Sequence, residues 1–184
     1  MKFFLIATLF LQSPILLADA LTDRLNGFAS QKNLQGSFVE MWSASYLSEP
    51  LVTQGKLFYK APDQLIKIIE RPDAIVQTIE SDQLTIKRDE DLRTLQLSEQ
   101  PTLAAGIYAL RSVLQGSKKN LKQYFNLRFN EFDSGWTLKL LPKQPVVAEK
   151  IKVIILRGTD NKIQQVRIQY HNGDSLRTEI SHDG

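Results

Sequence analysis

Turn residues at short, regular intervals divide most of this chain into strand-length apolar segments. Proline turns occur at Ala61-Pro62-Asp63 and at Arg71-Pro72-Asp73, and an Asn-Gly turn occurs at residues 172–173. Proline lacks the donor that a sheet interior needs, and Asn-Gly is the strongest short hairpin signal. Short strands at a spacing of roughly 8–12 residues are typical of an antiparallel meander. The sequence therefore predicts a mainly β chain of about ten or eleven strands.

Two regions have helical periodicity instead. Leu21, Leu25 and Phe28 recur at helical steps, and Thr22 is their candidate N-cap. This pattern predicts an amphipathic N-terminal helix. Apolar residues at helical steps also fill residues 101–116, between a proline and a glycine. With this second helical region in mid-chain, the expected class is α+β.

The first twenty residues have the layout of a secretory signal peptide. Lys2 precedes an apolar run from Phe3 to Leu11, and small residues stand at Ala18 and Ala20. Signal peptidase reads small residues at these two positions, so we expect cleavage near Ala20. A membrane anchor is the alternative reading. It needs about 20 uninterrupted apolar residues, whereas residues 12–14 (Gln-Ser-Pro) break this run.

Removal of residues 1–20 leaves residues 21–184 as the mature chain. A domain of this size buries roughly two-thirds of its unfolded surface, so we expect a single domain that folds alone. An exported chain without cysteine fits the bacterial periplasm, because thiols would meet an oxidising environment there. We expect a periplasmic monomer.

The composition excludes several kinds of site. The lack of cysteine removes thiolate metal ligands and Cys nucleophiles. His171 and His182 are the only histidines, which leaves little for a metal cluster or a Ser-His-Asp triad. The net charge of +3 is too weak to indicate a nucleic-acid partner. We therefore expect no metal, no cofactor and no catalysis, with a hydrolase as the least favoured function.

Some strands are apolar on both faces. In residues 64–70, Leu65 and Ile69 alternate with Ile66 and Ile68. A sheet with one wetted face alternates apolar and polar residues, so these strands need cover on both faces. Two arrangements fit this pattern. One is a fully packed α+β core, and the other is a half-closed barrel whose apolar hollow and helical lid carry a lipid.

The order of these elements resembles the LolA family of periplasmic lipoprotein carriers over almost all of residues 21–184. The resemblance depends on the order and spacing of several short motifs. These motifs are Phe38-Val39-Glu40, Gly55 to Leu65, Arg71-Pro72-Asp73, Ser81-Asp82-Gln83-Leu84, Gly135 to Pro142, and Asn172-Gly173-Asp174.

The resemblance implies an incomplete antiparallel β-barrel around a hydrophobic cavity that helices close. In the family, the cavity shelters the acyl chains of a lipoprotein, taken from an inner-membrane transporter and passed to an outer-membrane receptor. Acyl chains cost about 0.8 kcal/mol per exposed CH₂, so their transfer through water needs a shelter. The implied cargo is a lipoprotein or another lipid. The lack of cysteine argues against the anchored receptor of the same fold, LolB, which needs a lipidated N-terminal Cys.

Two sets of candidate residues follow. The cavity-lining set is Phe38, Leu57, Tyr59, Ile66, Ile68, Leu138 and Leu140. The lid set is Leu103, Ile107, Leu110 and Leu114. Ordinary core packing is the alternative for each of them.

One position departs from the family pattern. The carriers have an arginine just before the first turn proline, which bonds to the lid, and this chain has Ala61 there. The candidates for lid control are therefore Lys60 and Arg111. The alternative function is a binding or scaffold module of the same fold, with a filled core, that serves a lipid-export or biosynthesis machine.

Overall fold

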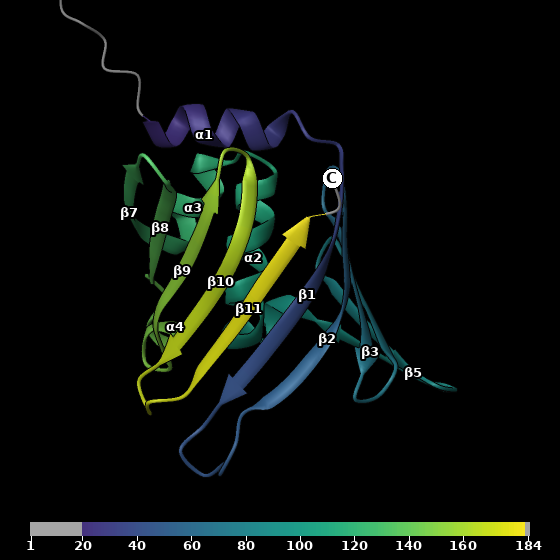
Figure 1. Cartoon of the computed structure of the whole chain (residues 1–184). Coiled ribbons are helices and arrows are strands. Elements are labelled where there is room, and N and C mark those ends of the chain that lie inside the picture. Colours follow the sequence, from purple (N-terminus) through teal and green to yellow (C-terminus); the bar gives the residue numbers. More distant parts are fainter. Residues whose placement is uncertain (1–19, 183–184) are drawn as a thin grey trace, which may run out of the picture.

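The sheet of this protein is antiparallel, curved and open. The computed structural model describes residues 20–182, in which eleven strands form one sheet in the order β6-β5-β4-β3-β2-β1-β11-β10-β9-β8-β7 (Figure 1). The strands are β1 (Asn33–Ser43), β2 (Leu51–Lys60), β3 (Gln64–Arg71), β4 (Ile75–Glu80), β5 (Gln83–Arg88), β6 (Asp91–Gln96), β7 (Phe125–Phe132), β8 (Gly135–Pro142), β9 (Ile151–Thr159), β10 (Lys162–Tyr170) and β11 (Ser175–His182). The edge strands β6 and β7 do not pair, so the barrel is incomplete. The expected mainly β class and strand number are confirmed.

The two ends of the sheet-forming chain meet in the middle of the sheet. Strand β1 pairs with the last strand, β11, so that Phe38 lies opposite Ile180. The Asn-Gly turn at residues 172–173 joins β10 to β11, and the proline turn at residues 61–63 joins β2 to β3. The turns that the sequence predicts therefore connect neighbouring antiparallel strands.

A close approach at Gly55 accompanies the bend between β2 and β3. The register of these strands shifts between Gln54 and Gly55, which marks a β-bulge. A Cβ atom added at Gly55 would lie 1.9 Å from the carbonyl oxygen of Ile68. Only glycine fits where two backbones come this close, and bulges bend the strand that carries them. Gly55 therefore belongs to the curvature that makes one face of the sheet concave.

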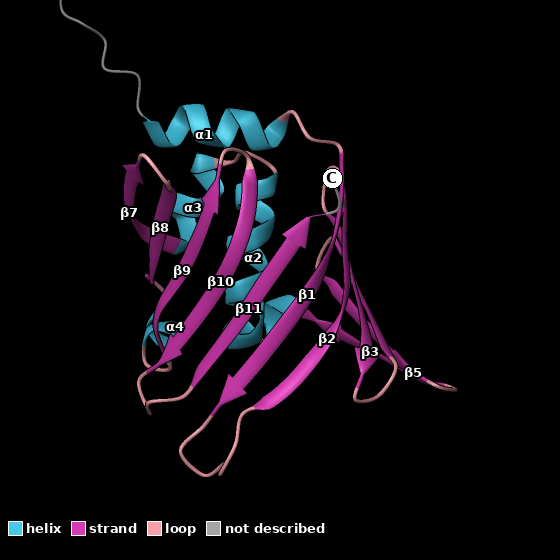
Figure 2. Ribbon diagram, in the orientation of Figure 1, coloured by secondary structure: helices cyan, strands magenta, loops and turns pink. Residues whose placement is uncertain are grey.

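The helices cover the concave face and one end of the sheet (Figure 2). They are α1 (Ala20–Ala29), the short 3₁₀ helix η1 (Leu97–Glu99), α2 (Pro101–Leu114), α3 (Lys118–Tyr124) and α4 (Pro145–Ala148). Helix α1 lies across one end of the sheet, and α2 runs along its concave side (Figure 1). Helix α2 buries three alanines, Ala104, Ala105 and Ala109. A Cβ added at the neighbouring Gly106 would lie 3.0 Å from Cδ1 of Ile168, so this helix sits close against β10.

Two sequence expectations differ from the structure or lie outside it. Thr22 is inside α1, which begins at Ala20, so it does not cap that helix. Between β8 and β9 lies the short helix α4, whose first residue is a proline, a favoured N1 residue. The signal peptide expected at residues 1–20 lies outside the described residues except for Ala20. Among the helices within residues 20–182, none is long and apolar enough to cross a membrane.

Candidate functional site

An apolar pocket lies where α1 and α2 meet the concave face of the sheet. Side chains and backbone from three helical or turn segments and five strands line it. Its lining residues are Phe28, Leu34, Gln35, Gly36, Leu57, Phe58, Tyr59, Leu65, Leu110, Leu114, Asn161, Ile163, Ile180 and His182. The pocket has room for about 60 Å³ of water-sized molecules. That is the space of about four waters, so the pocket is narrow in this conformation.

The two titratable side chains of this pocket already have hydrogen-bond partners. The Tyr59 hydroxyl donates to the Pro62 carbonyl oxygen at 2.9 Å. Nε2 of His182 lies 2.7 Å from the Ile163 carbonyl oxygen. Burial is the main cause that raises the pKa of Tyr59, so this phenol stays neutral at physiological pH. These two groups are therefore not arranged for proton transfer, and the rest of the lining is mainly apolar.

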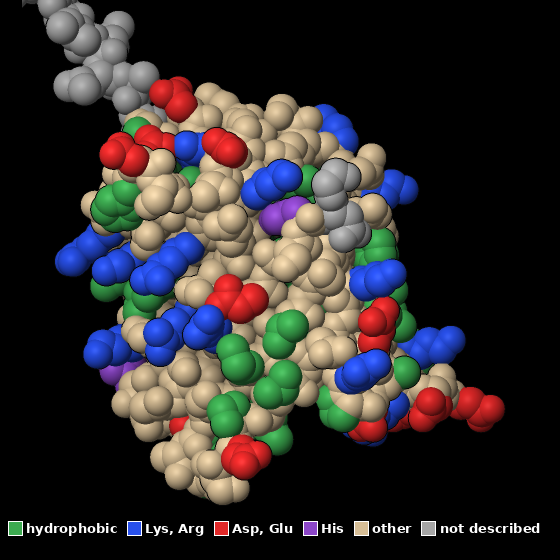
Figure 3. Space-filling model, in the orientation of Figure 1, with side chains coloured by type: hydrophobic (Ala, Val, Ile, Leu, Met, Phe, Trp, Pro, Cys, Tyr) green, Lys and Arg blue, Asp and Glu red, His purple; other side chains and the backbone are tan. Residues whose placement is uncertain are grey.

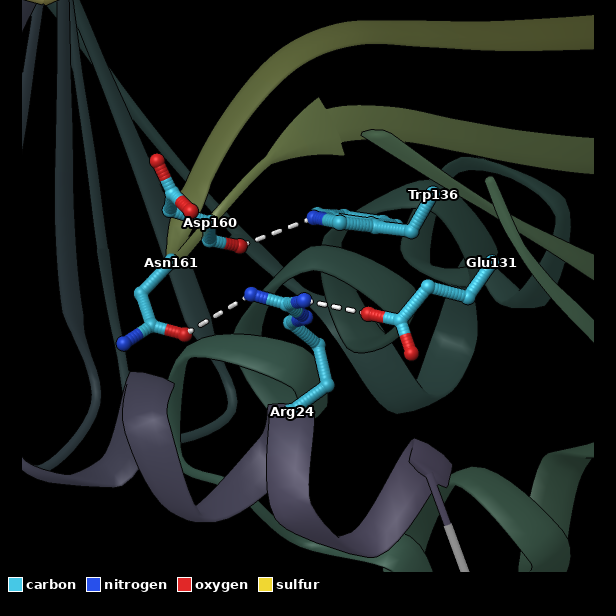
Figure 4. Close-up of polar contacts among 5 residues, drawn as sticks. All are labelled: Arg24, Glu131, Trp136, Asp160 and Asn161. Atoms are coloured by element: carbon cyan, nitrogen blue, oxygen red, sulfur yellow. Dashed lines mark hydrogen bonds and ion pairs between the residues drawn. The ribbon is translucent and has the colours of Figure 1, made fainter. Parts of the chain in front are cut away.

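Polar contacts of Arg24 connect α1 to β7 and to the β9–β10 turn, which Trp136 of β8 also contacts (Figure 4). Arg24 forms an ion pair with Glu131 and donates to Oδ1 of Asn161 at 3.5 Å. Nε1 of Trp136 donates to the Asp160 carbonyl oxygen at 2.9 Å. A Cβ added at Gly27 would lie 2.3 Å from Oδ1 of Asn161, so α1 packs closely on this turn.

The predicted cavity residues occupy three different places. Leu57 and Tyr59 line the pocket. Leu138 and Leu140 are fully buried in the core cluster and do not line it. Phe38 is buried on the same concave face, where the Lys67 ammonium lies 4.7 Å from its ring centroid. For these last three residues the structure shows core packing.

Ile66 and Ile68 require a correction. Strand register pairs Tyr59 with Leu65 and Phe58 with Ile66. Residues directly opposite each other share one face of the sheet, so Leu65 lies on the concave face with Tyr59. Ile66 and Ile68 then lie on the convex face, and the interpretation that they line the cavity is wrong. Ile68 pairs there with Val76 of β4.

The lid residues of α2 divide along the helix. Leu110 and Leu114 line the pocket. Ile107 is partly buried and packs against the core cluster. Leu103 is 48% exposed and does not line the pocket, so its interpretation as a lid residue is corrected. The buried alanines set the rotation of α2, and this rotation leaves Leu103 in solvent.

Three side chains of α2 and its C-terminal cap bind the turns beside the pocket. The Tyr108 hydroxyl donates to Oδ1 of Asp82 at 3.1 Å, and Nη1 of Arg111 donates to the Ser81 carbonyl oxygen at 2.5 Å. Nε2 of Gln115 donates to the Pro62 carbonyl oxygen at 3.0 Å. We call Tyr108, Arg111 and Gln115 the latch. The latch ties α2 to the β2–β3 and β4–β5 turns, while Lys60 lies exposed on the convex face next to Gln64.

The Asp82 carboxylate is the anionic centre of the latch. Hydrogen bonds lower its pKa, first of all the one from Oγ of Ser98 at 2.5 Å. Burial is the largest cause that raises the pKa of Tyr108 to about 12, followed by its hydrogen bond to Asp82. At physiological pH the Asp82 carboxylate is therefore charged and the Tyr108 phenol is protonated, so the hydrogen bond between them is kept.

Sequence reasoning missed several residues of the pocket. Phe28 and Leu34 come from α1 and β1, and Leu65 comes from β3. Ile163 and Ile180 come from the last two strands. Phe28 carried a usable signal, since it shares a helical face with Leu21 and Leu25. The others needed the strand register, which places β1, β2, β10 and β11 around one end of α2.

Comparison with known proteins assigns the family. The family model described as outer membrane lipoprotein carrier protein LolA-like matches residues 16–183. The chain belongs to the LolA-like family. The resemblance noted from the sequence motifs is thereby confirmed.

Solved structures similar to this LolA-like chain have low sequence identity to it. A DUF1329 family protein from Desulfovibrio piger is 10% identical with a TM-score of 0.51, and the match covers 88% of this chain and 89% of that one. A putative outer membrane lipoprotein-sorting protein domain from Vibrio parahaemolyticus is 10% identical with a TM-score of 0.48 and the same coverage. Among curated proteins, no sequence matches this chain.

Proposed function

We propose that this LolA-like protein is a non-catalytic carrier that shelters acyl chains of a lipoprotein or another lipid. Membership of the LolA-like family supports a role in carrying a lipid or a lipoprotein. The observation that carries the proposal is the apolar pocket under a helical lid, to which Leu110 and Leu114 contribute. In this proposal residues 1–20 are removed on export, and residues 21–184 act as a single monomeric domain in the periplasm.

The carrier takes its cargo from an inner-membrane transporter and delivers it to an outer-membrane receptor. Neither step needs a covalent reaction, which agrees with a pocket whose two titratable side chains already have hydrogen-bond partners. Within residues 20–182, no three His, Asp or Glu side chains form a group that could hold a metal ion. As proposed, the carrier has no enzyme activity, no cofactor and no nucleic-acid partner.

Loading requires the lid to move. In this conformation the pocket has room for about 60 Å³ of water-sized molecules, which is too little for an acyl chain. The three latch hydrogen bonds contribute about 1 kcal/mol each, as is typical of net values in water. Burial of about four methylenes at roughly 0.8 kcal/mol each matches that cost. A long acyl chain can therefore open the lid, and the latch together with Leu110 and Leu114 opposes binding that is too tight to reverse.

The latch also supplies a contact between lid and turn that Ala61 cannot make in place of the family's arginine. Ala61 cannot bond to a lid helix, but Arg111 reaches from α2 to the β4–β5 turn. Lys60 lies on the convex face, away from α2. We therefore assign lid control to Arg111 and not to Lys60.

The narrow pocket supports the second candidate function as well. A binding or scaffold module with a core filled by its own side chains would have an equally small pocket. Such a module would serve an envelope machine through its surface and would not take up lipid. The two functions differ in whether the pocket accepts an acyl chain in solution.

Titration with a fluorescent fatty acid separates them. The delipidated protein from the periplasm is expected to bind it saturably, and Leu110→Asp to weaken binding by about tenfold or more, since a buried charge enters the pocket. Leu103→Asp is the matched control, because Leu103 is on the same helix but exposed. No saturable binding by a natively folded protein contradicts the carrier function and leaves the scaffold module.

A further inference from the structure

A row of basic side chains crosses five neighbouring strands on the convex face of the sheet. Arg128 of β7 lies opposite Lys139 of β8, and Arg167 of β10 lies opposite Arg177 of β11. Ile155 of β9 lies opposite both Lys139 and Arg167 and completes the row. We call Arg128, Lys139, Arg167 and Arg177 the convex basic row. Like charges at this distance repel, so the row costs stability and is not explained by the fold.

Few carboxylates neutralise this row. Arg177 forms an ion pair with Glu179, its Nε lying 2.5 Å from Oε1. Within the described residues 20–182, Arg128, Lys139 and Arg167 have no ion pair, and Nε of Arg167 is buried without a hydrogen-bond partner. Arg157, exposed beside the row, lies opposite Thr137 and Gln165 and not a carboxylate. The positive charge of this surface is therefore largely uncompensated.

The basic side chains of the row cover an apolar residue of the sheet. Ile155 faces the convex side, which no helix covers, and yet it is only 9% exposed (Figure 2). Long basic side chains can cover apolar surface with their stems and keep their charged ends in water, and the stems of Lys139 and Arg167 flank Ile155. Strands lie about 4.8 Å apart, so the row spans about 19 Å from β7 to β11. Figure 3 shows Lys and Arg side chains gathered on this side of the molecule.

The same face becomes apolar beyond the row. Arg177 pairs with Met41 of β1, and Met41 pairs with Val52 of β2. Val52 is 49% exposed and Val39, beside Met41, is 41% exposed. A helix-free surface with cations on one side and exposed apolar side chains on the other matches a bilayer surface, which offers phosphates and apolar depth together. A single phosphate would need a pocket, and an acidic protein would not need the apolar part.

We propose that the convex basic row, with Arg157, docks the protein on anionic phospholipid headgroups of a membrane. This surface is opposite the pocket, so docking goes beyond cargo binding and does not depend on it. Each basic side chain near an anionic surface adds attraction that salt screens. Loss of four such charges is expected to weaken membrane association by about 100-fold or more.

Vesicle sedimentation of the exported, periplasm-purified protein tests the proposal. The vesicles are phosphatidylcholine alone and phosphatidylcholine mixed equally with phosphatidylglycerol. The row variant is R128Q/K139Q/R157Q/R177Q, in which each position is exposed. The control K32Q/R93Q/K119Q/K122Q removes the same charge from exposed positions outside the convex face. Circular dichroism and thermal unfolding verify that both variants fold.

The wild type and the control are expected to sediment with the phosphatidylglycerol vesicles only, less so as salt rises. The row variant is expected to stay in solution. No sedimentation of the wild type with these vesicles overturns the proposal, and so does an equal loss in both variants, which would reflect net charge alone. Fatty-acid binding by the row variant should match the wild type, so failure of docking and failure of the carrier function are distinguishable.

Discussion

Arg111 of the lid helix α2 donates a hydrogen bond to the carbonyl oxygen of Ser81, in the turn that joins β4 to β5. The resemblance to the LolA carriers implies an arginine in the β2–β3 turn that reaches toward the lid. In this chain that position is Ala61, and the arginine is on the lid while the acceptor is on a turn. A hydrogen bond still connects the lid to the sheet, but here its donor is on the lid helix and its acceptor is on a turn of the sheet.

Arg111→Ala is expected to loosen the lid. It removes one latch hydrogen bond and lowers the free energy of unfolding by about 0.5–1.5 kcal/mol. The same energy favours the open lid, so release of a bound fluorescent fatty acid should accelerate by up to about tenfold. Stopped-flow displacement measures the rate, and Lys60→Ala is the control. Equal acceleration in both variants would show that Arg111 does not control the lid.

Tyr108 is expected to ionise only near pH 12. Its pKa is raised to about 12, chiefly by burial and then by the bond to Asp82. A raised pKa means that the contribution to stability is complete below the unfolded value of about 10 and is lost as pH rises through 12. Tyrosinate absorbance against pH measures this, and Tyr108→Phe should remove the highest-titrating phenol. An unchanged titration curve in Tyr108→Phe would contradict the assignment.

Protonation of Asp82 is expected to weaken the latch and lower the free energy of unfolding at acid pH. Its pKa is lowered, mainly by the hydrogen bond from Ser98. A lowered pKa stabilises the fold above the unfolded value near 3.8, and this gain disappears as pH falls through the folded value. The free energy of unfolding of the wild type should therefore fall more steeply below pH 3.8 than that of Asp82→Asn. Parallel curves for the two proteins would mean that the carboxylate does not contribute.

Gly55→Ala is expected to destabilise the sheet by roughly 2–4 kcal/mol, because strain is added where no side chain fits. The new Cβ would lie 1.9 Å from the Ile68 carbonyl oxygen, a backbone atom that cannot turn away. Thermal unfolding measures the loss. Val52→Ala is the comparison on the same strand, since Val52 is half exposed and should change stability little. A stable Gly55→Ala protein would contradict the close approach of β2 and β3.

The strand number and the turns could be predicted from the sequence, but the faces of the strands could not. The turn at residues 61–63 pairs Lys60 with Gln64, which brings Leu65 and not Ile66 to the side of Tyr59. A shift of one residue reverses every side chain of a strand, and two apolar faces leave no pattern to choose between them. For the same reason Ile66 and Ile68 looked equivalent to true lining residues.

The lid illustrates a second limit. Helical periodicity predicts one apolar stripe from Leu103 to Leu114, and only its C-terminal half reaches the pocket. The rotation of α2 depends on how its buried alanines Ala105 and Ala109 pack, which is a property of the tertiary structure. The latch depends on turns that are 26 to 53 residues away in sequence, so periodicity carries no signal for it.

The carrier function requires the lid to move, and a crosslink between α2 and the β4–β5 turn would prevent this movement. The chain has no cysteine, so Arg111→Cys together with Ser81→Cys can be joined by a short bifunctional thiol reagent. Each single variant, treated with the same reagent, is the control. We expect saturable fatty-acid binding by the single variants and by the uncrosslinked pair, and loss of binding after crosslinking. Undiminished binding by the crosslinked protein would contradict the requirement for lid movement.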